Sequence, residues 1–385
     1  MPRSTKLLTL LSFLSMFFLG VGSTIIGAAA RNIGWTPSQI GFMLALEHIG
    51  FMLAVIISGA LADTHDKTKI LFFGSLLLAF AFYAFYLHDS FLLNLFVMFF
   101  VGAGIGSYEG VADTMLLDIH QERENLYINV NHFFVTLGCL MITLYLLFLQ
   151  MNWRRAIVQA AVAVFILAIL YGLVRLDSVR GASDTLVARL HFLKRQKALL
   201  ILLFVTICGV GLEVCLIGLL TTFLMELRNF TQTTSKIGLI VFLSAVAAGR
   251  LLVGFFTPRE KILDLLMLLF GLSVTFVVVL FFMRFDGFTY FMVLLTGAAV
   301  SALFPLCVVY TGILYPQMSG TALGILKMSI PIGGILFPLV LSLISRYSDF
   351  ETSLALFPFI AVCGFLTLLG NRNFLKMQGG PILNS

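Results

Sequence analysis

Apolar stretches of about twenty residues recur along the entire chain, and this pattern constrains the fold more than any other feature. A helix that crosses a membrane needs about 20 predominantly apolar residues. By that measure the sequence predicts twelve spans joined by mostly short connections, so successive helices are antiparallel neighbours. The predicted spans are residues 7–29, 38–61, 69–87, 91–117, 126–150, 155–175, 198–225, 236–256, 262–283, 288–313, 320–345 and 352–370.

The composition agrees with a membrane protein. Of the 385 residues, 60% are hydrophobic and 11% are charged, whereas a soluble domain has about 25% charged residues. The net charge of +6 does not indicate nucleic-acid binding, because the basic residues lie in short loops between apolar stretches. We therefore expect an all-α integral membrane protein surrounded by membrane lipid, with no nucleic-acid partner.

Motifs of enzymes and ATP-driven pumps are absent from the sequence. It contains no P-loop, no HExxH and no GxSxG pattern. The five cysteines lie inside apolar stretches and form neither a CxxC metal motif nor a paired framework. We therefore predict that the protein is not an enzyme and holds no cofactor and no metal ion.

The chain divides into two halves of six spans. Residues 1–175 are predicted to form the first six-helix bundle and residues 198–385 the second, joined by the basic linker 176–197. Residues 186–193 of this linker could form an amphipathic helix on the membrane surface, or the linker could be entirely solvated.

The two halves also resemble each other in sequence. Leu19-Gly20-Val21-Gly22 in the first span is echoed by Cys208-Gly209-Val210-Gly211 in the seventh, and the loop after the second span is echoed by the loop after the eighth. Repeated halves are typical of secondary transporters, which bind their substrate near the membrane midplane between the repeats.

Basic residues predict how the chain is oriented. The loops on the side of both termini and the linker carry 15 Lys and Arg, and the opposite loops carry 7. The positive-inside rule then places both termini in the cytoplasm. The first apolar stretch is longer than the 7–15 residues of a signal-peptide core, so we interpret it as an uncleaved span. We expect a multi-pass protein of the cell membrane, specifically a bacterial inner membrane.

The loop after the second span resembles the signature loop of the major facilitator superfamily, in which a glycine precedes an aspartate by four residues and basic residues follow. The matching residues are Gly59, Asp63, Lys67 and Lys69; Thr64 stands where the family usually has a basic residue. The resemblance implies a cytoplasmic gate containing Asp63, Lys67 and Lys69, with an ordinary charged turn as the alternative. A carboxylate at a helix end can accept hydrogen bonds from the free N–H groups of a neighbouring helix N-terminus.

Within that superfamily, residues 101–134 resemble the group of fucose, galactose and glucose–proton symporters. Their fourth and fifth spans carry G-x-G-x-G-x-x-E-x-x-x-N, an aspartate, and N-x-x-H-x-F-F. The matching residues are Gly102, Gly104, Gly106, Glu109, Asp118, Asn129, His132 and Phe134. Asp113 replaces the asparagine of the pattern, and a carboxylate accepts hydrogen bonds but does not donate them. The Gly-Pro that normally follows in the fifth span is absent from residues 135–143, which also distinguishes the chain from drug–proton antiporters.

Glu109 is the chief candidate for proton coupling. It lies about nine residues from the cytoplasmic end of the fourth span, which is about 13 Å at 1.5 Å per residue. Ionisable groups at this depth are rare and usually face a cavity. Burial and a nearby carboxylate at Asp113 both disfavour a charged carboxyl, which would allow reversible proton uptake. The alternative is that Glu109 pairs with a basic side chain and holds the helices together.

Three further residues are candidates for the proton-coupling or substrate site. In this superfamily spans 1, 4, 7 and 10 line the cavity, so Glu213 in the seventh span is expected to face Glu109. His132 could relay protons or hold the fifth span in place. Lys327 could bind an anionic substrate group, pair with an acid, or extend to the inner surface. Its span is expected to kink at Pro331, Gly333, Gly334 and Pro338.

Two other residues are assigned to gates. Arg250 lies at the cytoplasmic end of the eighth span, at a position equivalent to a gate position, and is expected to have a structural role there. Glu47, beside His48 in the outer half of the second span, is either part of an outer gate or a hydrogen-bonded structural contact.

The sequence as a whole predicts a monomeric secondary transporter with two six-helix bundles that works by alternating access. Its expected partners are a small polar solute, for which a sugar is the first candidate, and protons carried in the same direction. The alternatives are an exporter, or a carrier of a cationic, metal or lipid-like substrate. A membrane-embedded enzyme or receptor that uses Glu109 and Asp113 as an acid pair is a further alternative, although the sequence has no extramembrane domain or recognisable nucleophile.

Overall fold

The structure, a computed structural model, describes residues 3–87, 90–176, 185–284 and 287–383. All elements in these ranges are helical, and they include twelve helical segments long and apolar enough to cross a membrane. Each of these segments coincides with a predicted span, so the fold class is confirmed. Residues 177–184 of the predicted linker lie outside the described residues.

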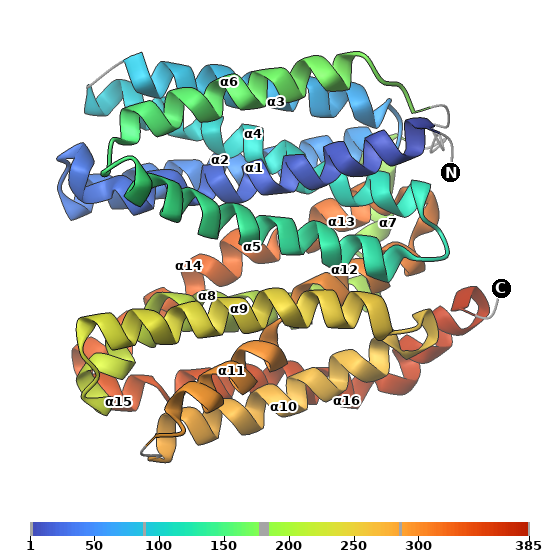
Figure 1. The fold of residues 1–385 in the computed structure, drawn as a ribbon. Coiled ribbons are helices and arrows are strands. Elements are labelled where there is room, and N and C mark those ends of the chain that lie inside the picture. The colour runs from blue at the N-terminus through green and yellow to red at the C-terminus, as the bar shows by residue number, and fades with distance from the viewer. Residues whose placement is uncertain (1–2, 88–89, 177–184, 285–286, 384–385) are drawn as a thin grey trace. The chain divides into compact units, whose positions relative to one another are not determined.

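The first compact unit comprises Met1–Leu193 and Tyr315–Met328. Within it α2 packs on α4, α1 on α5, and α3 on α6 (Figure 1). Its elements are α1 (Arg3–Ile33), α2 (Pro37–Ala62), α3 (Lys67–Leu87), α4 (Phe91–Ile119), α5 (Glu124–Phe148), α6 (Trp153–Gly172), α7 (Leu186–Leu193), the 3₁₀ turn η2 (Pro316–Met318) and α13 (Ser319–Leu326).

The second compact unit comprises Lys194–Leu314 and Ser329–Ser385. Within it α9 packs on α11, α8 on α14, and α10 on α16 (Figure 1). Its elements are α8 (Lys197–Arg228), α9 (Gln232–Phe256), the 3₁₀ turn η1 (Arg259–Lys261), α10 (Ile262–Phe282), α11 (Thr289–Val300), α12 (Leu303–Leu314), α14 (Ser329–Tyr347), α15 (Phe350–Ser353) and α16 (Leu356–Leu383).

The glycines of the sequence echo have the same physical task in both units. A Cβ on Gly20 of α1 would lie 2.1 Å from the backbone oxygen of Val135 on α5. A Cβ on Gly211 of α8 would lie 1.9 Å from the ring of Phe337 on α14. Small residues allow helices to approach this closely in membranes. The glycines of the echo therefore allow close packing in both units, but not on equivalent partners, because Gly209, which aligns with Gly20, faces Leu303 of α12.

The first part of the eleventh span does not belong to the same compact unit as its neighbours in sequence. Residues 315–328 form part of the first unit, whereas the prediction assigned the entire range 198–385 to the second bundle. α13 packs on α2, where a Cβ on Gly320 would lie 2.2 Å from the backbone oxygen of Gly59. Gly324, one turn later, also lies against α2. Glycine spacing on α13 therefore permits this close contact.

Two spans are interrupted in the middle, and prolines explain both positions. Proline has no N–H, so the carbonyl four residues earlier loses its helical partner. Pro305 leaves the carbonyl of Ser301 without a helical donor, and α11 gives way to α12 at residues 301–302. Pro331 does the same for Lys327, and α13 gives way to α14 at residues 327–328. The expected kink thus falls before Pro331, while α14 continues through Pro338.

Packing of α2 on α4 leads to a test of the fold. A Cβ on Gly102 of α4 would lie 1.9 Å from the backbone oxygen of Glu47 on α2. Gly102→Ala should therefore lower the free energy of unfolding by about 1–3 kcal/mol, the usual effect of overpacking. Gly27→Ala is the control, because a Cβ there meets no atom within 4 Å. Thermal melting in detergent should show a lower midpoint for the first variant only; equal midpoints would contradict the packing described.

Candidate functional site

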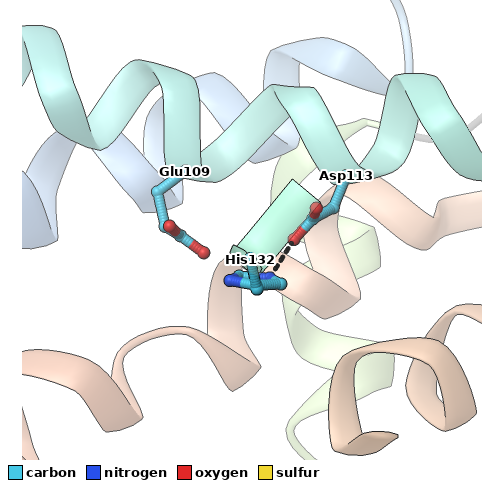
Figure 2. A group of neighbouring side chains, drawn as sticks. All are labelled: Glu109, Asp113 and His132. Atoms are coloured by element: carbon cyan, nitrogen blue, oxygen red, sulfur yellow. Dashed lines mark hydrogen bonds and ion pairs between the residues drawn. The ribbon is translucent and has the colours of Figure 1, made fainter. Parts of the chain in front are cut away.

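Four ionisable side chains of the first unit meet at one place, and we call them the acid–lysine cluster. Glu109 and Asp113 lie one turn apart on α4, His132 lies on α5, and Lys327 directly follows α13. Figure 2 shows the two carboxyls and the imidazole pointing toward one another. Each of the four residues is at most 3% exposed. The structure therefore brings together four of the five predicted proton-coupling residues.

Lys327 is the centre of the cluster. Its Nζ lies 2.8 Å from Oε1 of Glu109 and 2.5 Å from Oδ2 of Asp113. The same ammonium donates to the backbone oxygen of Glu109. Lys327 is 0% exposed, so its side chain does not extend to the inner surface. Of the three alternatives predicted for Lys327, the structure agrees with an ion pair to acidic side chains.

The two carboxyls of the cluster are held very differently. Asp113 accepts a hydrogen bond from Asn131 Nδ2 at 2.7 Å and lies 3.0 Å from His132 Nε2, in addition to its contact with Lys327. The side chain of Glu109 has one described partner, the ammonium of Lys327. Hydrogen bonds to the charged form of a carboxyl favour that form. Asp113 is therefore the more firmly held carboxyl of the cluster, and Glu109 is the less firmly held one.

The formal charges of the cluster do not balance when both carboxyls are ionised. Two carboxylates carry two negative charges and Lys327 carries one positive charge, so one negative charge is left when His132 is neutral. An uncompensated charge out of water is strongly unfavourable. The cluster therefore sets two carboxyls against one ammonium, with the imidazole of His132 beside Asp113.

The cluster also has a donor set that could hold a metal ion. One ligand atom each from Glu109, Asp113 and His132 lie within 4.8 Å of one another. Oxygen and imidazole donors suit several divalent cations. The ammonium of Lys327 contacts both carboxylates in this structure, however, so the position of a cation is taken by a side chain of the protein itself.

Asp63, predicted as a gate residue, lies at the end of α2 and accepts hydrogen bonds from the start of α13. The backbone N–H of Gly320 donates to its Oδ1 at 2.7 Å, and the N–H of Thr321 to its Oδ2 at 2.8 Å. The hydroxyl of Thr321 also donates to Oδ2. These contacts satisfy free N–H groups of a helix N-terminus, as the loop motif implies.

Arg189 completes this arrangement, which we call the Asp63 latch (Asp63, Arg189, Gly320 and Thr321). Its Nη1 lies 2.6 Å from Oδ2 of Asp63 and also donates to the hydroxyl of Thr321 at 2.8 Å. Arg189 lies on α7 and is only 3% exposed. The sequence predicted a surface helix or a solvated linker here, and the structure instead buries one cation of that helix.

The two lysines of the predicted gate differ in their surroundings. Lys67 Nζ lies 2.7 Å from Oδ2 of Asp118, which joins the start of α3 to the end of α4. Lys69 is exposed, and its side chain makes no hydrogen bond or ion pair within the described residues. The structure therefore brings Lys67, but not Lys69, into an ion pair.

In the second unit, the predicted site residue Glu213 pairs with the predicted gate residue Arg250. Arg250 Nη2 lies 2.8 Å from Oε1 of Glu213 and 3.0 Å from its Oε2. Arg250 Nε donates to the carbonyl of Ser301 at 2.9 Å, the carbonyl that Pro305 leaves without a helical donor. Arg250 thus supplies the missing hydrogen bond at the break between α11 and α12. The expected approach of Glu213 to Glu109 stays a prediction.

Glu47 and His48 do not form a pair. His48 Nδ1 lies 2.7 Å from the backbone oxygen of Leu44 on its own helix. Glu47 is 3% exposed, and its Oε2 has no hydrogen-bond partner. Adjacent residues on a helix point in different directions, which explains why the two side chains are apart. One of the two alternatives for Glu47 was a hydrogen-bonded contact that holds the structure together. The structure shows no such contact between Glu47 and His48.

Sequence reasoning missed Arg189 and Asn131. Arg189 was treated as one of many basic residues in the linker. It lies four residues before Leu193 on α7, and these two residues form the buried face of that helix. Asn131 immediately precedes His132 and contributes a hydrogen bond to Asp113, and Ser12 in turn donates to its Oδ1 at 3.2 Å. Asn131 lies within the matched motif, between Asn129 and His132, and this position was the available signal.

Comparison with known families gives one match that covers most of the chain. The family model described as Major Facilitator Superfamily matches residues 8–295. Among curated proteins, no sequence matches significantly.

Solved structures similar to this one are transporters of the same architecture. The transporter FucP in an outward conformation has a TM-score of 0.79 at 16% identity, over 95% of this chain and 99% of that chain. The proton:xylose symporter XylE has a TM-score of 0.76 at 14% identity, over 97% and 96%. The human organic anion transporter MFSD10 has a TM-score of 0.79 at 13% identity, over 96% and 100%. At these identities the likeness shows the fold.

His120, between α4 and α5, leads to a prediction about pH. Its Nε2 lies 2.8 Å from Oγ1 of Thr9, and its ring stacks on Tyr127 with centroids 3.4 Å apart. Burial lowers the pKa of His120 from 6.5 to about 4. The unfolded chain therefore binds more protons than the folded protein between these values, so stability falls as the pH drops from about 6.5 to about 4.

His120→Gln should reduce this loss of stability, because glutamine can keep a hydrogen bond to Thr9 but does not titrate. Melting temperatures of the purified protein at pH 7 and pH 4.5 measure the effect. The difference between the two pH values should be smaller in the variant than in the unchanged protein. An equal difference would show that His120 is not protonated on unfolding.

Proposed function

Because the chain belongs to the Major Facilitator Superfamily, we propose that it is a proton-coupled symporter that moves a small polar solute by alternating access. The family and the fold identify a transporter rather than an enzyme. FucP and XylE are described as fucose:proton and proton:xylose symporters, and residues 101–134 resemble that group. A sugar is therefore the first candidate for the solute.

The observation that carries the proposal is the charge imbalance of the acid–lysine cluster. Glu109 has one partner, Lys327, while Asp113 has three. Protonation of Glu109 leaves Lys327 paired with Asp113 alone, so the cluster becomes neutral and its hold on Lys327 weakens. Glu109 is thus the proton acceptor, Asp113 the permanent anion and Lys327 the internal counter-ion.

α13 connects this proton site to the predicted gate. Its first residues, Gly320 and Thr321, bind Asp63, and Lys327 follows its last residue. A helix of eight residues spans about 12 Å at 1.5 Å per residue. A movement of α13 that breaks the Asp63 latch must therefore also displace Lys327 from the carboxyls. Proton binding at Glu109 and opening of the gate are coupled through this one short helix.

The proton gradient supplies the energy for uphill transport. Its electrical part is worth about 2.3 kcal/mol per charge per 100 mV. Uphill transport requires that the solute-loaded protein changes state only with Glu109 protonated. In the deprotonated state, the pair between Glu109 and Lys327 keeps α13 in place.

A second candidate function is transport of cationic solutes. It is favoured because the acid–lysine cluster already binds a cation, the ammonium of Lys327, between its two carboxyls. A cationic solute would displace Lys327 from Glu109 and Asp113. A thermal-shift screen of sugars, amino acids and cationic amines at two pH values separates the two candidates, because a ligand that binds the folded form raises the melting temperature. Stabilisation by sugars that depends on pH supports the first candidate, and stabilisation by amines alone supports the second.

Replacement of Glu109 tests proton coupling. Glu109→Gln should abolish uphill solute accumulation in proteoliposomes while exchange of solute across the membrane continues, because glutamine imitates the protonated carboxyl permanently. Asp113→Asn is the comparison, and it should lower the melting temperature as well, since Lys327 then loses its best-held partner. Unchanged accumulation in the Glu109 variant would remove Glu109 from the coupling mechanism.

Replacement of Arg189 tests the Asp63 latch. Loss of one partner of a buried ion pair costs about 3–5 kcal/mol if the other partner stays buried, so Arg189→Ala should favour the open gate. A cysteine at Val55, which is 0% exposed where α13 covers α2, should then react severalfold faster with a membrane-impermeant thiol reagent. The background lacks the five native cysteines.

Arg195→Ala is the matched control for this experiment. Arg195 belongs to the same linker region and is exposed, with no hydrogen bond or ion pair among the described residues. The reactivity of the cysteine should stay unchanged in this variant. If both arginine variants react alike, the latch does not hold the gate closed.

A further inference from the structure

Glu47 on α2 carries a carboxyl that the proposed cycle leaves without a task. Its side chain is 3% exposed, and its Oε2 has no hydrogen-bond partner. Within the described residues the carboxyl makes no ion pair at all. An ionised carboxylate buried in this way would have lost its water without gaining a partner, which is strongly unfavourable, whereas the neutral acid avoids that penalty.

Charged and titratable groups near α2 have contacts of their own. α2 packs on α4, α13 and α3. None of the titratable groups on these helices, within the described ranges, forms a hydrogen bond or ion pair with Glu47. On α4, Glu109 and Asp113 contact Lys327, Asp118 contacts Lys67, and Tyr108 donates to Ser75. On α3, Tyr83 stacks on Tyr86 and Lys69 is exposed. On α2, His48 contacts the backbone of Leu44, and Asp63 at the end of the helix pairs with Arg189.

Glu47 is separate from the acid–lysine cluster but lies on the same pair of helices. α2 and α4 cross at this residue, because a Cβ on Gly102 would lie 2.9 Å from the Cα of Glu47. Glu109 follows Gly102 by seven residues on α4, which is about 10 Å along the helix. A proton on Glu47 is therefore a different proton from the one that balances the cluster.

We propose that Glu47 is a second proton-binding site of this protein, protonated in the packing seen here and exchanging its proton with solvent when the surroundings of α2 open during transport. The carboxyl oxygen holds the proton as a neutral acid, and release leaves a carboxylate in contact with water. The exchange during transport rests on the proposed function, whereas the protonated state of the buried carboxyl does not.

Infrared spectroscopy of the complete protein in detergent at pH 7 tests the protonated state. The difference spectrum between unchanged protein and Glu47→Gln should contain the C=O band of one protonated carboxyl, which shifts in D₂O. Glu47→Asp should shift this band and not remove it. Glu226→Gln, which removes an exposed carboxyl of α8, is the control and should leave the band unchanged. No loss of a protonated-carboxyl band in Glu47→Gln would overturn the proposal.

Proton flux in proteoliposomes tests the exchange. The number of protons taken up per solute should be lower in Glu47→Gln than in the unchanged protein. An equal number would overturn the exchange during transport, while the infrared result still decides whether Glu47 binds a proton. If the unchanged protein moves solute without any proton uptake, the proposed symport fails, and the infrared result again stands independently.

Discussion

The first unit depends on the ion pairs of Lys327, whose ammonium is held out of water between two carboxylates. A charged side chain at the membrane centre costs about 2.5–3.5 kcal/mol on insertion scales, and an unpaired one inside a protein is worse. Lys327 is 0% exposed, so it is tolerable only while α4 supplies Glu109 and Asp113. The same requirement fixes α13 against α4 and orients Asn131 and His132 of α5 around Asp113. One cation thus determines the positions of three helices.

The same interaction explains why the chain departs from the symporter pattern at Asp113. The asparagine of that pattern is neutral, so its replacement by aspartate adds a buried negative charge. Lys327 supplies the compensating positive charge at 2.5 Å. In this chain the extra acid is therefore accompanied by an intramembrane lysine that pairs with it. At the loop motif, where Thr64 stands in place of a basic residue, Arg189 of α7 pairs with Asp63.

The sequence was sufficient to predict the features that depend on neighbouring residues. The twelve spans follow from local hydropathy, and Glu109 and Asp113 stood out because acids are rare inside such spans. The partners of these acids depend on contacts between distant segments, so the pair of Lys327 with an acid was one alternative among three and Arg189 was missed. The position of the break before Pro331 could have been predicted, because the missing N–H affects the carbonyl of Lys327 four residues earlier. The membership of residues 315–328 in the first unit could not, since it results from the packing of Gly320 and Gly324 on α2.

The proline breaks described above have a consequence for how the tenth and eleventh spans can deform. Bending an intact helix sharply means giving up backbone hydrogen bonds, which is expensive in a medium without water. At Ser301 and at Lys327 the helical bond is already missing, so each span has a joint that can flex without further loss. At Ser301, Arg250 Nε donates to the free carbonyl in place of the missing helical N–H and stiffens the joint. Shape changes in this protein can therefore be concentrated at single peptide units, with the ionic partners of Arg250 and Lys327 setting how freely each joint turns.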